Sequence, residues 1–254
     1  MKYIKHCILL AIVTTIVLVA CKKNVLTVSP FEYTNGKALL KVVYACPYAR
    51  NPGVIIKING EKVSSVITYS TPYPGGGLNT GGNSFADYLS VKPGENTVSL
   101  SIPYVGTGND SILLHQGVYN FVANQFQSLH LTDTLTSTQA VQIIDPANRP
   151  DSGLVLFRFV NLIPNSGGID LYFGPTKVAS NVMYKASTDT FSIAAGTSLA
   201  WSLRNAGETG TLGTTYTSAS TVANQRVFTV YARGYTGLPV ADIRSPKISF
   251  AYNK

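Results

Sequence analysis

Cysteine and histidine are scarce in this sequence, which has only three of each among 254 residues. Two of the cysteines, Cys7 and Cys21, belong to an N-terminal targeting segment, so Cys46 has no partner for an intramolecular disulfide. A catalytic thiol would need a base and an orienting group, and no motif marks either one. Cys46, which stands beside Pro47, is most simply a small buried residue.

Motifs of known enzyme classes are also missing. The sequence has no Gly-x-Ser-x-Gly, no His-Glu-x-x-His, no Cys-x-x-Cys and no Walker loop. His115 and His130 lack a partner at the spacing of metal ligands. A glycosidase could combine two distant carboxylates, such as Asp87 and Asp110, but nothing singles them out. We therefore expect a non-enzymatic protein with no catalytic residues, no metal site and no cofactor.

Acidic residues are few: 12 Asp and Glu stand against 20 Lys and Arg, for a net charge of +8. Nucleic-acid binding would require clustered cations interleaved with aromatic residues. In the second half of the chain the cations are dispersed, which is typical of the solvated faces of strands. We expect no nucleic-acid partner, and a weak attraction for acidic glycans or lipid surfaces stays open.

The sequence lacks an apolar run of the roughly 20 residues that a spanning helix needs. Its longest one, residues 7–20, follows Lys2 and Lys5, which is the layout of a secretory signal peptide. The run ends in Leu18-Val19-Ala20-Cys21, which resembles a bacterial lipobox. The resemblance implies cleavage after Ala20 and acylation of Cys21 at its thiol and new amino group. The alternatives are an ordinary signal peptide and an uncleaved anchor.

Lysines follow this cysteine directly. Lys22 and Lys23 can meet anionic lipid headgroups, and residues 21–36 form a short lipidated tether. The membrane, reached through Cys21, is thus the first expected partner. We expect an outer-membrane lipoprotein on either the periplasmic face or the cell surface, because no acidic residue follows the cysteine.

An internal repeat organises the rest of the chain. Residues 39–59 and 154–174 each contain an alternating strand, a proline, a Gly/Asn/Pro loop and a second apolar strand. A repeat of this kind predicts two copies of one domain, each large enough to bury its own core. The predicted boundaries are as follows: signal peptide 1–20, tether 21–36, first domain 37–134, linker 135–152 and second domain 153–254.

The composition favours strands over helices, because Thr, Ser, Val, Tyr and Gly are common. With about seven short strands per copy, we expect an all-β protein of two tandem antiparallel immunoglobulin-like β-sandwich domains. A small closed barrel is the alternative.

Three local patterns support this fold. Asn59-Gly60 predicts a two-residue hairpin turn, since both positions tolerate positive φ. Trp201 alternates in register with Leu199 and Leu203, so it is expected in the core. Late strands are expected at 118–123 and 227–232, and closing strands at 129–134 and 248–252.

A glycine-rich loop, residues 71–84, distinguishes the first copy from the second. It carries five glycines and two prolines and is expected to have no regular structure. Loops that differ on a shared scaffold often carry function, so this loop is a candidate binding surface; an ordinary surface loop is the alternative. The candidate residues are Tyr73, Gly75, Gly76, Gly77 and Asn79.

The two copies resemble the domain of unknown function family 4397, which occurs in bacterial envelope proteins, often in tandem. The resemblance rests on residues 43–47, 158–164 and 169–173, with later turns at Pro93-Gly94 and Ala195-Gly196. It implies fold and location, and it carries no catalytic residues. The first copy has Ile55 where an acidic residue, Asp170 in the second copy, is common.

The sequence thus predicts a non-enzymatic, lipid-anchored cell-envelope protein that presents tandem sandwiches to an unknown envelope protein or glycan. One alternative is a carbohydrate-binding module of a polysaccharide uptake system, which requires exposed coplanar rings at residues such as Tyr73 and Tyr88. The other is a structural subunit of a surface appendage, which needs a donor strand or an open groove.

Overall fold

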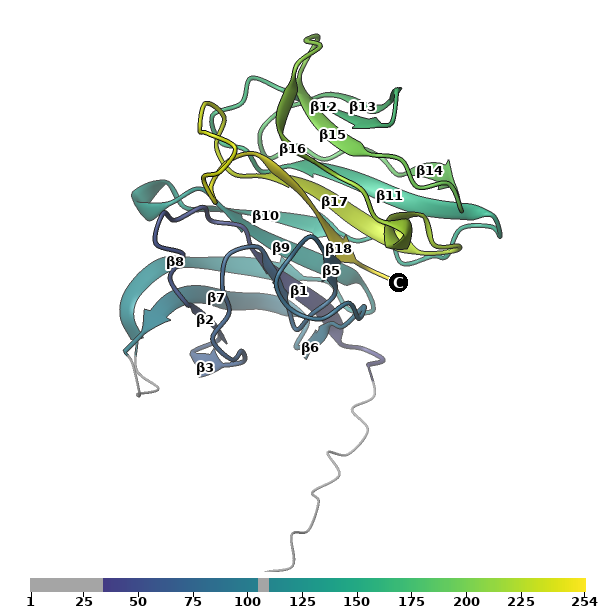
Figure 1. Ribbon diagram of the computed structural model, residues 1–254. Helices are drawn as coiled ribbons and strands as arrows, with labels where there is room; N and C mark the ends of the chain where they lie inside the picture. Colours follow the sequence, from purple (N-terminus) through teal and green to yellow (C-terminus); the bar gives the residue numbers. More distant parts are fainter. Residues whose placement is uncertain (1–33, 105–109) are drawn as a thin grey trace, which may run out of the picture. The chain divides into compact units, whose positions relative to one another are not determined.

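Four β-sheets and two short 3₁₀ helices make up the part of the chain described by the computed structural model, residues 34–104 and 110–254 (Figure 1). Residues 34–254 form one compact unit. In the described residues, no helix is long or apolar enough to cross a membrane. The predicted signal peptide and the predicted lipidation site, Cys21, both lie outside the described residues.

The first half of the chain forms two sheets that enclose one core. One sheet has the order β10-β9-β1-β4, with β6 also paired to β1, and the other has the order β3-β2-β7-β8. Leu40 and Val42 from the first sheet share a core with Ile56 and Leu100 from the second. The strands are β1 (Ala38–Tyr44), β2 (Ile55–Ile58), β3 (Glu61–Lys62), β4 (Thr71–Tyr73), β6 (Leu89–Val91), β7 (Gly94–Pro103), β8 (Asp110–Phe121), β9 (Phe126–Thr132) and β10 (Gln139–Ile144).

The second half repeats this arrangement. Its sheets have the orders β14-β11-β17-β18-β5 and β13-β12-β15-β16, and Trp201 is fully buried between them. The strands are β11 (Leu154–Asn161), β12 (Ile169–Phe173), β13 (Thr176–Val182), β14 (Phe191–Ala194), β15 (Trp201–Asn205), β16 (Thr211–Tyr216), β17 (Val227–Arg233) and β18 (Lys247–Tyr252). The strand β5 (Gly77–Leu78) comes from the first half of the chain.

The predicted fold class is confirmed, because both halves are antiparallel-rich β-sandwiches. They depart from a purely antiparallel pattern at one place each: β1 runs parallel to β9, and β11 runs parallel to β17. Eight strands correspond between the halves, and β4 and β5 are additional to the first.

The residues predicted as a linker include a strand. Gln139–Ile144 forms β10, which pairs antiparallel with β9 along its whole length. The predicted correspondence between the last strands of the two copies was therefore wrong by one strand. Residues 227–232, in β17, correspond to β9 and not to residues 118–123, and β18 corresponds to β10. The polar residues around β10 concealed it, and within QAVQII only Ile143 is buried, so the strand has no clear apolar face.

The glycine-rich loop was wrongly expected to lack regular structure, because it contains β4 and β5. Other local predictions are confirmed. Asn59 and Gly60 have φ of 53° and 84° and join β2 to β3. Cys46 is fully buried, and burial raises the pKa of its thiol, as expected for an inert small core residue.

Candidate functional site

The two sandwiches contact each other through the faces of their inner sheets that point away from the two cores. An apolar cluster fills part of this interface, with Val43 and Ala45 from the first half and Val160 and Tyr231 from the second. Its remaining fully buried or nearly buried members are Ile143, Leu162 and Ala251. The face of β1 that alternation separates from the core is therefore not solvated.

A buried carboxylate lies at the polar end of this interface. Asp145, which follows β10, is 3% exposed. It accepts hydrogen bonds from Ser128 Oγ at 2.8 Å, Thr229 Oγ1 at 3.2 Å and Tyr88 OH at 3.0 Å. Thr229 belongs to the second half and the other donors to the first. Asp145 thus joins the two halves through charge-assisted hydrogen bonds.

Lys41 is the buried cation of the same cluster. It lies mid-strand in β1, donates its Nζ to the carbonyl oxygen of Tyr252, and stands 4.4 Å from the ring centroid of Tyr88. Burial lowers the pKa of Lys41 to about 8, against the attraction of Asp145 and Asp87. Burial likewise raises the pKa of Asp145, against the charge of Lys41. Each group thus loses hydration that the other only partly replaces.

His130 completes the cluster as a neutral imidazole. Its Nε2 lies 2.9 Å from Ser128 Oγ, and its ring lies 5.5 Å from that of Tyr231. Burial, and then the charge of Lys41, lowers the pKa of His130 to about 3. In a nucleophilic triad the imidazole lies between hydroxyl and carboxylate, but here the Ser128 hydroxyl lies between His130 and Asp145. The arrangement is that of a structural network.

The sequence reasoning missed this cluster. Neither Lys41 nor Asp145 was assigned to a site from the sequence. The available signal was the position of Lys41 within the apolar run 39–44, because a lysine there must either reach water or find buried partners.

The glycine-rich loop reaches the second sandwich. Leu78 and Gly77 of β5 pair with Phe250 and Ala251 of β18, and Tyr252 N donates to Gly76 O at 3.0 Å. Asn79 Nδ2 donates to Ile248 O at 2.6 Å. The candidate binding residues Gly76, Gly77 and Asn79 therefore bridge the two halves.

Three consecutive glycines permit this close approach. A Cβ on Gly75 would lie 2.3 Å from Asn83 Oδ1, and one on Gly76 would lie 1.8 Å from Phe85 O. At Gly77 the nearest atoms are Thr80 Oγ1 at 2.5 Å and Phe250 O at 2.7 Å. Any side chain would displace the loop, so these glycines serve packing.

Tyr73 and Tyr88 do not form an open aromatic platform. Tyr73 is half-buried and donates its hydroxyl to Val63 O at 2.6 Å. The Tyr88 ring is covered by Lys41 Nζ and by the edge of Phe126, whose centroid is 5.0 Å away. Tyr73 does line a cleft of about 300 Å³ on the outer side of the loop, with Pro74, Gly81 and Gly82 among its neighbours.

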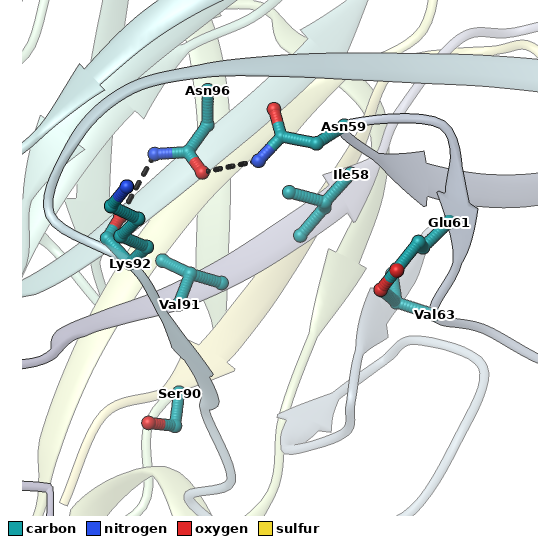
Figure 2. A pocket seen from close by; sticks show the side chains of 8 residues that line it. All are labelled: Ile58, Asn59, Glu61, Val63, Ser90, Val91, Lys92 and Asn96. Atoms are coloured by element: carbon teal, nitrogen blue, oxygen red, sulfur yellow. Dashed lines mark hydrogen bonds between the residues drawn. The ribbon is translucent and has the colours of Figure 1, made fainter.

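A second pocket of about 300 Å³ opens at the end of the first sandwich (Figure 2). Its apolar surface comes from Ile58, Val63 and Val91. In Figure 2, Ile58 and Val91 lie between Lys92 on one side and Glu61 and Val63 on the other. Both charged residues are exposed, so the pocket presents one charge of each sign around an apolar floor.

The polar rim of this pocket is fixed by two asparagines. Asn59 Nδ2 donates to Asn96 Oδ1, and Asn96 Nδ2 donates to Lys92 O, each at 2.9 Å (Figure 2). Asn96 Nδ2 also donates to Gly94 O at 2.9 Å. Ser90, also in the lining, has a buried Oγ with no hydrogen-bond partner among the described residues. The pocket suits a small dipolar or hydroxyl-bearing group. In the described ranges, no group of three His, Cys, Asp or Glu side chains could hold a metal ion.

A comparison with protein families matches residues 38–172 and 156–245 to the family described as Domain of unknown function (DUF4397). The chain belongs to the DUF4397 family. The two DUF4397 matches start near β1 and β11, as expected for two copies. A comparison with curated proteins found no match.

The two DUF4397 copies differ at the acidic position. Asp170 is buried and accepts hydrogen bonds from Asn181 N at 2.7 Å and Gly207 N at 3.3 Å, and its Oδ2 lies 2.6 Å from Lys177 Nζ. Burial raises the pKa of Asp170, but these partners lower it below its ordinary value overall. Its counterpart Ile55 is fully buried, and its hydrocarbon side chain cannot accept a hydrogen bond. Asp170 therefore stabilises the second copy only.

Proposed function

We propose that this DUF4397 protein is a non-enzymatic, lipid-anchored protein of the bacterial cell envelope that acts by binding other envelope molecules. Cys21 would carry the acyl chains, and residues 22–33 would connect the membrane to the folded unit that begins at Thr34. Several acyl chains, at about 0.8 kcal/mol per buried CH₂, would anchor the unit firmly.

The observation that carries this proposal is the enclosure of the reactive side chains. Lys41, His130 and Asp145 are buried between the two sandwiches, and Lys41 and Asp145 form hydrogen bonds across the interface, with Tyr252 O and Thr229 Oγ1. What the unit offers to other molecules is its outer surface. The pocket in Figure 2 is the contact site that we favour, and the cleft beside Tyr73 is a second one.

The structure gives little support to carbohydrate binding through stacked aromatic rings, because such binding requires exposed coplanar rings. The Tyr88 ring is covered by Lys41, and its hydroxyl is bonded to Asp145. The Tyr73 hydroxyl donates to the backbone carbonyl of Val63. A glycan contact at the pocket would depend on Ser90, Glu61 and Lys92 instead.

The anchor is tested by metabolic labelling of cells with an alkyne fatty acid. The wild type is expected to incorporate label and to enter the membrane fraction, whereas Cys21→Ser should do neither. Cys7→Ser is the matched control, because it removes a cysteine from the same segment. Label retained in Cys21→Ser would contradict the lipoprotein assignment. If the wild type is labelled as expected, protease treatment of intact cells shows which face of the membrane the unit occupies.

The contact site is tested by crosslinking in intact cells. Lys92→Glu reverses the charge on one wall of the pocket and is expected to reduce crosslinking of bound envelope molecules. Lys62→Glu is the matched control, because Lys62 is exposed on the neighbouring hairpin without lining the pocket. Equal crosslinking in both variants would exclude the pocket as the contact site.

A further inference from the structure

The strand β8 is an edge strand whose backbone is covered only in part: Asn120 O accepts a hydrogen bond from Gln142 Nε2 at 2.9 Å. With 12 residues it is the longest strand in the described part of the chain, and there it pairs only with β7. Figure 1 shows it at the border of its sheet. The N–H and C=O groups on its other side have no strand partner, and such an edge is a template for another strand.

The usual protections against edge pairing are nearly absent. Residues 111–121 contain no Asp, Glu, Lys, Arg or Pro, although charges and prolines are the residues that commonly block an edge. Asp110, at the start of β8, is paired with Lys57 at 2.9 Å. Leu113 and Val118 are 56% and 63% exposed. Two bulges, at Leu114 and at Ser111, interrupt the pairing with β7 within this stretch.

The bulge at Leu114 sets which residues share a face. His115 pairs with Leu100, and Leu113 pairs with Ser101, so Leu114 is the extra residue. Val118 pairs with Thr97, the neighbour of the core residue Val98. Leu113 and Val118 therefore both lie on the outer face of the sheet, on either side of the exposed Gln116.

We propose that two copies of this chain associate through antiparallel pairing of β8 with β8 about a two-fold axis at Gln116. In this register, Leu113 of one copy lies against Val118 of the other, because the bulge residue Leu114 absorbs the difference in spacing. Apolar residues thus meet apolar residues on both sides of the axis, as an isologous interface requires. Since residues 111–121 are uncharged, self-pairing places no like charges opposite one another.

A second observation extends the apolar surface beside this edge. A cleft of about 440 Å³ is lined by Ile112, Leu113 and the 3₁₀ helix η1 (Leu135–Ser137). Leu135 is 71% exposed although its φ is 56°, a strained value for a branched residue, and its N–H is held by Tyr48 OH at 2.9 Å. The fold thus holds an apolar side chain outward at a cost, next to the proposed interface.

The experiment uses the mature chain from residue 21 with Cys21→Ser, studied by sedimentation velocity over a range of concentrations. The wild type is expected to show a monomer–dimer equilibrium. Gln116→Lys would place two lysines at the two-fold axis and raise the dimer dissociation constant at least about tenfold. Thr215→Lys is the matched control, because Thr215 is exposed on β16, the equivalent edge strand of the second half, and should leave the equilibrium unchanged.

A second variant tests the same interface by forming a bond across it instead of weakening it. Gln116→Cys is expected to form a disulfide-linked dimer under mild oxidation, whereas Thr215→Cys should not, and Cys46 is buried and does not interfere. A wild type that is monomeric at every concentration would overturn the proposal. So would a dimer that survives Gln116→Lys, because another surface would then be responsible. Neither result bears on the lipid anchor.

Discussion

At the scale of single residues, the pair Lys41 and Asp145 gives a direct test of the buried cluster. Asp145 is the carboxylate that most favours the charge of Lys41. Asp145→Asn is expected to lower the free energy of unfolding by about 3 kcal/mol, since it leaves a buried charge uncompensated. The double variant Lys41→Met/Asp145→Asn should recover part of this loss.

Urea unfolding of the wild type, Asp145→Asn and the double variant measures these differences. The control is Asp151→Asn, at an exposed position, which should change the free energy of unfolding by less than about 0.5 kcal/mol. A double variant that is no more stable than Asp145→Asn would show that the two groups are not coupled.

His130 gives a prediction about pH. Burial lowers its pKa in the folded protein to about 3, below the ordinary value of 6.5. On acidification the unfolded chain therefore binds a proton that the folded chain does not. The contribution of His130 to stability should therefore fall by up to about 1.4 kcal/mol per pH unit between pH 6.5 and 3.

Asp145, with its raised pKa, acts in the opposite sense, because the folded protein binds a proton at Asp145 more readily than the unfolded chain does. The difference between the wild type and His130→Gln, followed by urea unfolding from pH 8 to 4, isolates the histidine. A difference independent of pH would contradict a neutral buried imidazole.

At the scale of elements, the glycine-rich loop is a structural connection between the sandwiches. Gly76 combines a φ of 91° with a Cβ position 1.8 Å from Phe85 O. Gly76→Ala is expected to cost about 3 kcal/mol, since both the backbone and the contact must give way. Gly237→Ala is the matched control: its φ is 81°, but no atom lies within 4 Å of the added Cβ, so the cost should be about 1 kcal/mol. Equal costs in urea unfolding would show that the close approach of Gly76 to Phe85 O does not contribute to stability.

At the scale of the whole molecule, the two halves should unfold together. They share the apolar cluster of Val43 and Val160, the hydrogen bonds of Asp145, and the pairing of β5 with β18. Trp201 is the only tryptophan and lies in the core of the second half, so its fluorescence reports that half, whereas far-ultraviolet circular dichroism reports both. The two transitions should coincide in urea. Separate midpoints would indicate independent domains.

The sequence by itself determined the repeat, the all-β class and the local turns. Alternation predicted the first strand of each copy, and Asn59-Gly60 specified its hairpin, because these signals depend on residues close in the chain. Trp201 was placed correctly for the same reason. These features need no knowledge of what lies across the interface.

Only the tertiary structure decided what covers the other face of each inner sheet. A period of two shows that Lys41 and Val43 lie opposite the core, but it does not reveal whether water or another sheet meets them. The same limit concealed β10, whose residues read as a polar linker, and β5, whose glycines read as a free loop. Contacts between residues as distant as Lys41 and Tyr252 leave no local pattern, so the joining of the two halves could not be derived from the sequence.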